Sequence, residues 1–305
     1  MVADPKLEAL AAELERHADY RVLRRLEADR ERPALVGEDI AHAVVLDTET
    51  TGMDPAKDRI VELALVKFEY LRSTGEVGRV LGRYDGLEDP GMPIPPEATA
   101  VHGITDEMVR GRRLAEEDIE RLMEGVGVVI AHNAGFDRPF TERRLPEFAG
   151  LAWGCSLREV PWESEGLGSA KLDYLAYRHG FFYDAHRAQN DCHAVLELLR
   201  RPFGTTARSA LHLLLQSARE PSARLWATGS PFESKDLLRA RGYRWDGEQR
   251  CWYRDIPSAA AERDAECQWL REAVYGGRAA VVDLETFDAR TRYSGRSGRR
   301  ERLRL

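Results

Sequence analysis

The chain has 305 residues, enough for one core of about 150 to 200 residues and a smaller module, so we expect two folded units. Hydrophobic residues make up 43% and charged residues 32%, which argues against long disorder and indicates a globular protein. No apolar run reaches the roughly 18 residues of a membrane span, and the first segment is too charged for a secretory signal. We therefore expect a cytoplasmic protein that does not bind membranes.

The net charge and the cysteines indicate which kinds of metal, disulfide and phosphate-binding site to expect. The four cysteines are scattered without CxxC spacing, so we expect reduced thiols and neither a zinc site nor a disulfide framework. A net charge of −7 is unusual for a protein that binds phosphates through Lys and Arg. It fits an enzyme that gathers carboxylates around divalent cations, because the cations can then receive the phosphate.

The first 40 residues are predicted to form an N-terminal helical arm. Residues 5–32 carry apolar positions at helical spacing among many charges, which indicates one or two amphipathic helices. Packing within the chain and binding to a partner remain alternative roles for this arm.

A domain over residues 41–202 follows. Its first strands are predicted in AHAVVLDTETTG, from Ala41, and in RIVELALVKFEY. The stretch LEDPGMPIPPEATAVHGIT is too rich in proline for a helix, so we expect a surface loop that leads to His102. GVGVVIAHNAGFD supplies another buried strand. The remaining segments with a helical pattern are 106–124, 136–146, 169–179 and 190–201.

Strands that alternate with helices after an opening hairpin indicate an α/β fold, with a mixed central sheet and helices on both faces. Beyond this domain we expect a linker at 203–224, a small α+β module at 225–290 and a basic disordered tail at 291–305.

Within the module, aromatic residues alternate with arginines and could form a surface that stacks on a single strand of nucleic acid. Strand alternation predicts that about half of the aromatics are core residues instead. The residues concerned are Tyr243, Trp245, Trp252, Tyr253, Arg241, Arg244, Arg250 and Arg254.

Four acids fall where a metal site is expected. Asp47 and Glu49 are two positions apart in a strand, so their carboxylates point to the same face at its carboxyl end. Asp137 opens a helix after the next apolar strand, where stabilisation of the helix N-terminus is the alternative role. Asp191 lies on the inward face of its helix, and an inward carboxylate requires a partner such as a metal ion.

His186 precedes Asp191 by five residues, and we place it in the loop that leads into that helix. From this loop its imidazole could accept the proton of an attacking water. A purely structural histidine is the alternative.

In chain order, VVLDTETTG, HNAGFD and HRAQND resemble the three motifs of the DnaQ-like (DEDDh) 3′–5′ exonuclease superfamily, which includes the DNA polymerase III epsilon subunit and ribonuclease T group. VHGIT resembles a further segment typical of that superfamily. The resemblance covers residues 41–202 and implies a ribonuclease-H-like fold. It makes Asp47, Glu49, Asp137 and Asp191 the metal-site acids and His186 the general base.

The same resemblance implies hydrolysis of a 3′ end to nucleoside 5′-monophosphates with two Mg²⁺ ions, for which Mn²⁺ could substitute, and with no organic cofactor. It also places Thr50, Met53, His102 and Ile104 near the terminal nucleotide. Plain core packing is an equal alternative for Met53 and Ile104.

The expected substrate is the 3′ end of DNA, preferably single-stranded, in repair or replication. An RNA-trimming exonuclease, a proofreading subunit docked on a DNA polymerase and a non-catalytic binding module remain alternatives. A second DxE pair, Asp283 and Glu285, lacks the TG turn that follows the first pair, so we expect no second site there.

Overall fold

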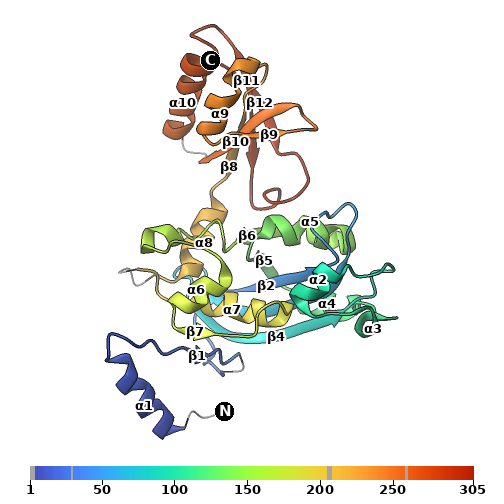
Figure 1. The fold of residues 1–305 in the computed structure, drawn as a ribbon, viewed down its shortest axis with the longest axis vertical. Helices are drawn as coiled ribbons and strands as arrows, with labels where there is room; N and C mark the ends of the chain where they lie inside the picture. The colour runs from blue at the N-terminus through green and yellow to red at the C-terminus, as the bar shows by residue number, and fades with distance from the viewer. Residues whose placement is uncertain (1–3, 29, 205–207, 258–259) are drawn as a thin grey trace.

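The computed structural model describes residues 4–28, 30–204, 208–257 and 260–305. Figure 1 shows two folded units and an N-terminal helix along the long axis of the molecule. No helix within these residues is long and apolar enough to span a membrane.

The larger unit is built on a five-stranded sheet of order β4-β3-β2-β5-β6. β2 and β3 pair antiparallel, as do β3 and β4, whereas β2, β5 and β6 run parallel. The strands are β2 (Ile40–Thr50), β3 (Ile60–Leu71), β4 (Val77–Leu87), β5 (Val126–Ala131) and β6 (Ala152–Cys155).

Helices cover both faces of this sheet, which is why β2 and β3 are buried at most positions while the edge strand β4 alternates. One face packs against α6, α7 and α8, and the other against α4 and α5. The helices are α2 (Pro96–His102), α3 (Asp106–Val109), α4 (Glu116–Met123), α5 (Ala134–Arg144), α6 (Leu172–Arg178), α7 (Ala188–Arg200) and α8 (Ala210–Arg219). The expected mixed α/β fold is confirmed.

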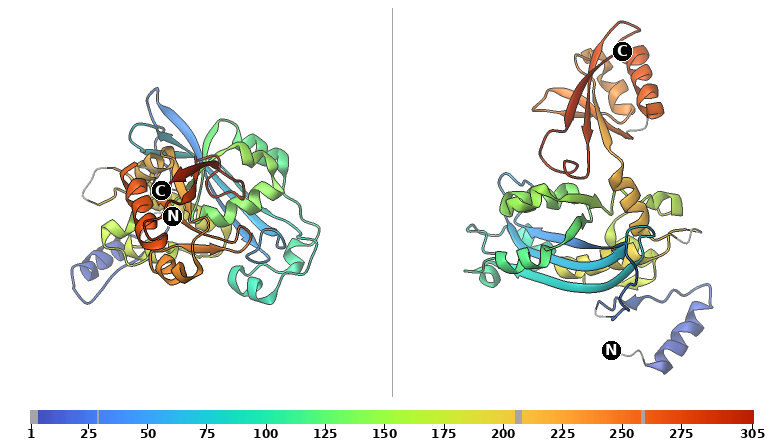
Figure 2. Two further views of the ribbon diagram at one scale, coloured as in Figure 1. Left: turned by 90° about the horizontal axis from the view of Figure 1, so that it is seen from above. Right: turned by 180° about the vertical axis from the view of Figure 1, so that it is seen from behind.

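The smaller unit is an antiparallel sheet of order β12-β11-β8-β10-β9, with α9 and α10 against one face. The right-hand view of Figure 2 shows both helices on that side. Its elements are β8 (Ser222–Trp226), α9 (Lys235–Ala240), β9 (Arg244–Asp246), β10 (Cys251–Pro257), α10 (Ala260–Trp269), β11 (Val281–Phe287) and β12 (Arg299–Arg304).

The arm predicted to hold one or two helices holds one, α1 (Pro5–Glu15), which buries no residue, and the chain after it forms β1 (Arg24–Arg25), which pairs with β7 (Phe181–Phe182). Three other local predictions are wrong. The proline-rich loop contains α2, because proline is tolerated at the first helical position, where no N–H is needed.

The other two corrections concern the C-terminal third. The predicted linker contains α8, whose Leu211 and Leu214 are fully buried in the core of the larger unit. The tail predicted to be disordered forms β12, because Arg300 pairs with Glu285 and Leu303 packs on the module core. Cross-strand charge pairs of this kind compensate for the repulsion within a basic segment.

The two units meet along a seam between α5 and the loop that follows β11. The guanidinium of Arg138 is fully buried and donates to the carbonyls of Ala289, Arg290 and Arg292 at 3.2, 2.5 and 2.6 Å. Arg292 in turn pairs with the buried Glu159. The module is therefore bound to the helix that carries Asp137.

Candidate active site

Three of the predicted acids meet at the carboxyl end of β2. Strand alternation places Asp47 and Glu49 on one face, and α7 brings Asp191 against it. One carboxylate oxygen from each of the three lies within 4.8 Å of the others. Clustered oxygen ligands of this kind suit a hard divalent cation.

Asp191 is held by two hydrogen bonds from the segment before its helix. The Tyr183 hydroxyl donates to Oδ1 at 2.9 Å, and the backbone N–H of His186 donates to Oδ2 at 2.9 Å. Both donors lie in the loop between β7 and α7. The carboxylate is thereby oriented before any ligand binds.

Asp137 lies beside this cluster and is almost completely buried. It accepts hydrogen bonds from the backbone N–H of Thr48 at 3.1 Å and from the Thr48 hydroxyl at 2.8 Å. Thr48 is the residue between Asp47 and Glu49, so Asp137 is bound directly to the strand that carries the first pair of acids.

Burial and mutual repulsion shift the pKa values of all four acids upward. Burial raises the pKa of Glu49 to about 8, and the charge of Asp191 adds to the effect. Burial also raises the pKa of Asp137 to about 7, against the hydrogen bonds from Thr48. The pKa of Asp47 rises well above its usual range, through burial and then the charge on Asp137. Like charges gathered at one place in this way are stabilised by a bound cation.

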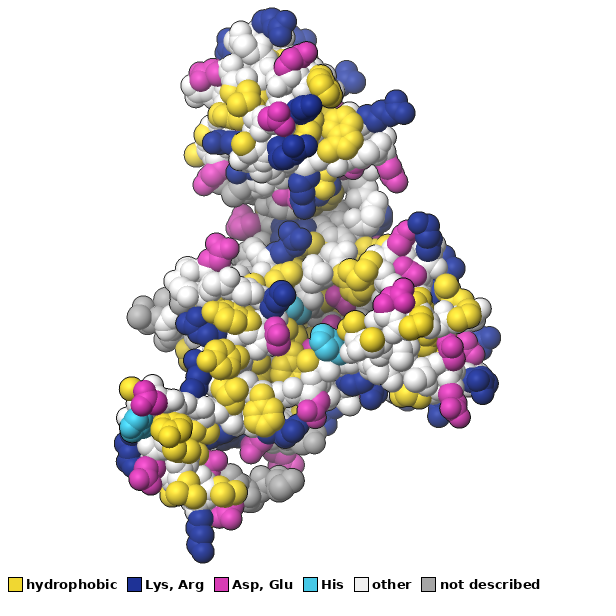
Figure 3. All heavy atoms as spheres, viewed as in Figure 1, with side chains coloured by type: hydrophobic (Ala, Val, Ile, Leu, Met, Phe, Trp, Pro, Cys, Tyr) yellow, Lys and Arg dark blue, Asp and Glu magenta, His cyan; other side chains and the backbone are white. Residues whose placement is uncertain are grey.

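His186 lies in the loop before α7, as predicted, with a left-handed backbone of φ 64°. Its side chain is exposed while its backbone holds Asp191. In Figure 3, histidine and acidic side chains border a hollow near the centre of the face that is shown. A histidine at the rim of an acidic site can exchange protons with bulk water.

The sequence analysis missed Glu62, a fully buried acid opposite Glu49 on β3. Glu62 accepts from Arg187 Nη2 at 2.6 Å and from the backbone N–H of Ala188 at 2.9 Å, so it anchors the start of α7 next to His186. The signal in the sequence is an acid in an otherwise apolar run, VELALV, since an acid in a buried strand must have a partner.

The four residues expected near the terminal nucleotide fall into different environments. Met53 is 78% exposed, so it is free to contact a ligand, whereas Ile104 is fully buried in a small cluster with Val61. The hydroxyl of Thr50 donates to the carbonyl of Gly52 at 2.6 Å and closes the turn after β2.

His102 is also buried, and its Nδ1 accepts from the N–H of Ile104 at 3.0 Å. Burial lowers the pKa of His102 and so disfavours the charged form of its ring.

The predicted aromatic surface of the module is largely used for structure. Tyr243 and Trp252 pack in the module core, and Tyr253 packs against Trp226 on the opposite face. Trp245 is 53% exposed. Of the arginines in that set, Arg241 and Arg254 pair with Glu266, and Arg244 pairs with Asp255.

A family model described as an exonuclease, RNase_T, matches residues 44–199, about half of the chain and the segment that holds all four acids and His186. This chain belongs to the DnaQ-like exonuclease superfamily. The resemblance of its three motifs to that superfamily is confirmed.

Curated relatives agree with this assignment. The DNA polymerase III subunit epsilon of Treponema pallidum is 30% identical over 162 residues, which are 50% of this chain and 72% of that protein. The PolC-type DNA polymerase III of Clostridium perfringens is 31% identical over 166 residues, or 52% of this chain. The match spans only 11% of the length of that relative.

Solved exonuclease structures are also similar to the chain. Exonuclease X in complex with 5′ overhanging duplex DNA covers 56% of this chain and 99% of its own, with 24% identity and a TM-score of 0.39. The Escherichia coli exonuclease I complex with single-stranded DNA covers 71% of this chain and 63% of its own, with 15% identity and a TM-score of 0.48.

Proposed function

We propose that this exonuclease-family chain removes nucleotides from the 3′ end of DNA and releases nucleoside 5′-monophosphates. The observation that carries the proposal is the acidic cluster, in which oxygens of Asp47, Glu49 and Asp191 lie within 4.8 Å of one another. The buried Asp137 lies next to them through Thr48. All four acids come from the motifs by which the sequence resembles the superfamily.

The donor set fits a pair of divalent cations, for which we propose Mg²⁺ with Mn²⁺ as a substitute. Every donor is a carboxylate oxygen, and burial raises the pKa values of all four acids, with neighbouring carboxylates adding to the effect at Asp47, Glu49 and Asp137, so a bound cation would stabilise their ionised forms. In the proposed arrangement Asp47, Glu49 and Asp191 hold one ion, and Asp47 with Asp137 holds the other. Bound at such sites, divalent cations neutralise the phosphate and make a water molecule more acidic.

The residues around the cluster then have distinct tasks. His186 is proposed as the general base that accepts the proton of the attacking water, which its exposed place at the rim allows. Tyr183 and the backbone of His186 keep the Asp191 carboxylate in place. Arg187 and Glu62 fix the segment that presents His186.

The terminal nucleotide is proposed to lie against the turn after β2. Met53 provides an exposed thioether on which a base can pack, and Thr50 shapes the turn. Ile104 and His102 are buried, and we propose that they support this side of the nucleotide site without contacting solvent.

DNA is the favoured substrate because relatives of this chain are named as a PolC-type DNA polymerase III and as the epsilon subunit of DNA polymerase III. Those names also support a DNA polymerase as a partner, with a repair protein as the alternative. RNA trimming is the competing function, because the proposed cations would act on the phosphate, which DNA and RNA share, and not on the sugar that distinguishes them.

The test is digestion of a 5′-labelled single-stranded DNA oligonucleotide and of an RNA oligonucleotide of the same sequence. We expect a ladder that shortens from the 3′ end of the DNA and requires Mg²⁺. EDTA and Asp47→Ala should abolish it, and His186→Ala should reduce kcat about 100-fold. A strong preference for RNA would overturn the substrate choice, and shortening from the 5′ end would overturn the polarity.

A further inference from the structure

A basic groove runs along β4, one of the two edge strands of the central sheet. It has a volume of about 910 Å³ and is lined by residues of β3 and β4, of α4 and the loop before it, and of the start of α7. We call it the β4 edge groove. Its basic residues are Lys67, Arg83, Arg112, Arg113, Arg121 and Arg187.

The charge of this groove is opposite to that of the whole chain. Six basic residues face three acids there, Glu62, Asp85 and Asp118, although the chain as a whole has a net charge of −7. Two of these acids are already neutralised, because Glu62 pairs with Arg187 and Asp118 pairs with Arg121. The groove therefore keeps an excess of positive charge in an acidic protein.

Arg112 and Arg113 contribute most directly to this excess. Both are exposed, and neither forms a salt bridge with any acid in the described part of the chain. Their loop is held in place by backbone hydrogen bonds, from Arg112 N–H to the Val109 carbonyl at 2.8 Å and from Asp89 N–H to the Arg112 carbonyl at 3.0 Å. Exposed arginines on a backbone held in this way can bind phosphate oxygens.

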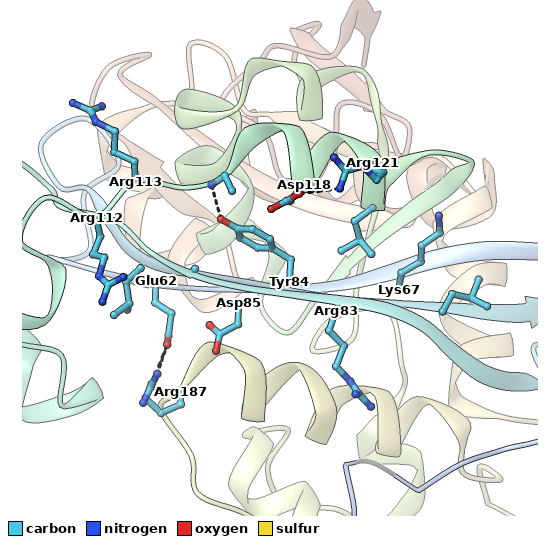
Figure 4. A pocket seen from close by; sticks show the side chains of 15 residues that line it. Glu62, Lys67, Arg83, Tyr84, Asp85, Arg112, Arg113, Asp118, Arg121 and Arg187 are labelled. Carbon is cyan, nitrogen blue, oxygen red and sulfur yellow. Dashed lines mark hydrogen bonds and ion pairs between the residues drawn. The ribbon is translucent and has the colours of Figure 1, made fainter.

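The groove continues directly from the acidic cluster. Glu62 lines the groove at one end and is the cross-strand neighbour of Glu49. Arg187, which pairs with Glu62, follows His186 in the chain. Figure 4 shows Arg112, Arg113 and Arg187 at the Glu62 end of the groove, with Arg83, Arg121 and Lys67 farther along β4.

We propose that the β4 edge groove binds the sugar-phosphate backbone of the nucleic acid beyond the nucleotide that is being removed. This inference rests on the proposed function, because it extends the substrate from the acidic cluster along β4. The arginines contact phosphates and not bases, so binding there is independent of sequence and sensitive to salt.

The test compares two double variants that remove the same charge. Arg112→Ala with Arg113→Ala alters the groove, whereas Arg16→Ala with Arg271→Ala removes two exposed arginines elsewhere. Binding of a 20-nucleotide single strand and of a duplex with a recessed 3′ end is followed by fluorescence anisotropy in EDTA. Melting curves by circular dichroism confirm that each variant is folded.

We expect the groove variant to bind the single strand about tenfold more weakly, with a log–log salt slope reduced by about 1.4. The Arg16/Arg271 variant should bind like the wild type, and Arg112→Lys with Arg113→Lys should keep most of the affinity. A loss that is greater for the duplex would assign the groove to the complementary strand, and an equal loss would assign it to the digested strand.

Equal affinity and equal salt slopes for the groove variant and the wild type would overturn the proposal. The hydrolysis of thymidine 5′-monophosphate p-nitrophenyl ester separates this result from a failure of the proposed function. The ester is too short to reach the groove, so its kcat/KM should stay within about twofold in the groove variant. A wild type that hydrolyses neither ester nor oligonucleotide would contradict the proposed function, while the anisotropy still decides whether the groove binds nucleic acid.

Discussion

Two of the places where the molecule buries charge are built in opposite ways. At the carboxyl end of β2, acids gather with no basic side chain bonded to Asp47 or Asp137 among the described residues. At the seam, the buried Arg138 has an ion-pair partner in Glu142 and three backbone carbonyls as acceptors.

This difference in charge pairing shows how to recognise which buried charges bind a ligand. At the seam, the buried charge has its hydrogen-bond and ion-pair partners within the protein. Such a cluster holds one unit on the other and does not need a ligand. In the acidic cluster, burial and then the charges of neighbouring acids raise the pKa values of Asp47 and Glu49, and burial raises that of Asp137, so a bound cation would lower the electrostatic cost of this site. Loss of one charge should therefore stabilise the metal-free acidic cluster and destabilise the seam.

The largest effect is expected for Asp47→Asn in the acidic cluster. The variant should lose about 10³-fold in kcat/KM, because the shared ligand is gone. It should also melt at a higher temperature than the wild type when both are free of metal, since one of several repelling charges has been removed. The measurements are oligonucleotide digestion and thermal melting in EDTA.

Asp283→Asn is the matched control, because Asp283 belongs to the second DxE pair and lies opposite Arg302. It should leave activity unchanged. A metal-free Asp47→Asn protein that melts below the wild type would mean that the acidic cluster is not repulsive.

At the seam, Arg138→Met should lower the free energy of unfolding by about 3 kcal/mol, because Glu142 and the carbonyls lose their buried donor. Urea titration measures the change, with Arg158→Met as the control at an exposed arginine. A loss no greater than that of the control would show that the seam does not contribute to stability.

The pH dependence of stability should reveal the acidic cluster in the metal-free protein. The folded-state pKa of Glu49, about 8, exceeds its unfolded value, so between about pH 4.5 and 8 the folded state binds more protons than the unfolded state. Stability from this cluster is therefore highest at the acidic end of the window and falls as pH rises. The melting temperature of the metal-free protein should be several degrees higher at pH 5.5 than at pH 8.

Mg²⁺ should remove this trend by stabilising the ionised carboxylates, with a larger gain in melting temperature at pH 8 than at pH 5.5. Glu49→Gln should flatten the pH profile of the metal-free protein. An identical profile for the variant and the wild type would show that other groups control it.

The smallest effect is expected for Tyr183→Phe, which removes the hydroxyl that donates to Asp191 Oδ1. Affinity for Mn²⁺ should fall about tenfold, because the carboxylate loses the group that orients it. Calorimetric titration of Mn²⁺ measures this without substrate. Tyr177→Phe changes an exposed tyrosine on α6 and should have no effect. Equal Mn²⁺ affinities for the two variants would show that Tyr183 does not contribute to the metal site.

The sequence was informative wherever a short segment carried its own pattern. Alternation in β2 predicted that Asp47 and Glu49 share a face, and helical spacing placed Asp191 inward. The role of Ile104 remained open in the sequence, because an apolar residue near a site can contact a ligand or fill the core, and the structure buries it.

Features that depend on distant partners could not be found in this way. Glu62 acquires its role from Arg187, a residue 125 positions away, and β12 depends on charges supplied by β11. Local composition therefore misassigned the tail as disordered, since the acids that pair with its arginines belong to another segment.

The sequence by itself determined the family, the order of the strands and helices around the motifs, and the acids that can hold a metal. The spacing of apolar residues and the residue types are local properties, which can be read directly from the sequence. Only the tertiary structure decided that α8 belongs to the core, that the module is bound to α5 through Arg138, and that arginines from separate loops line the β4 edge. Burial and charge pairing are properties of the surroundings, which the chain creates only when its distant segments come together.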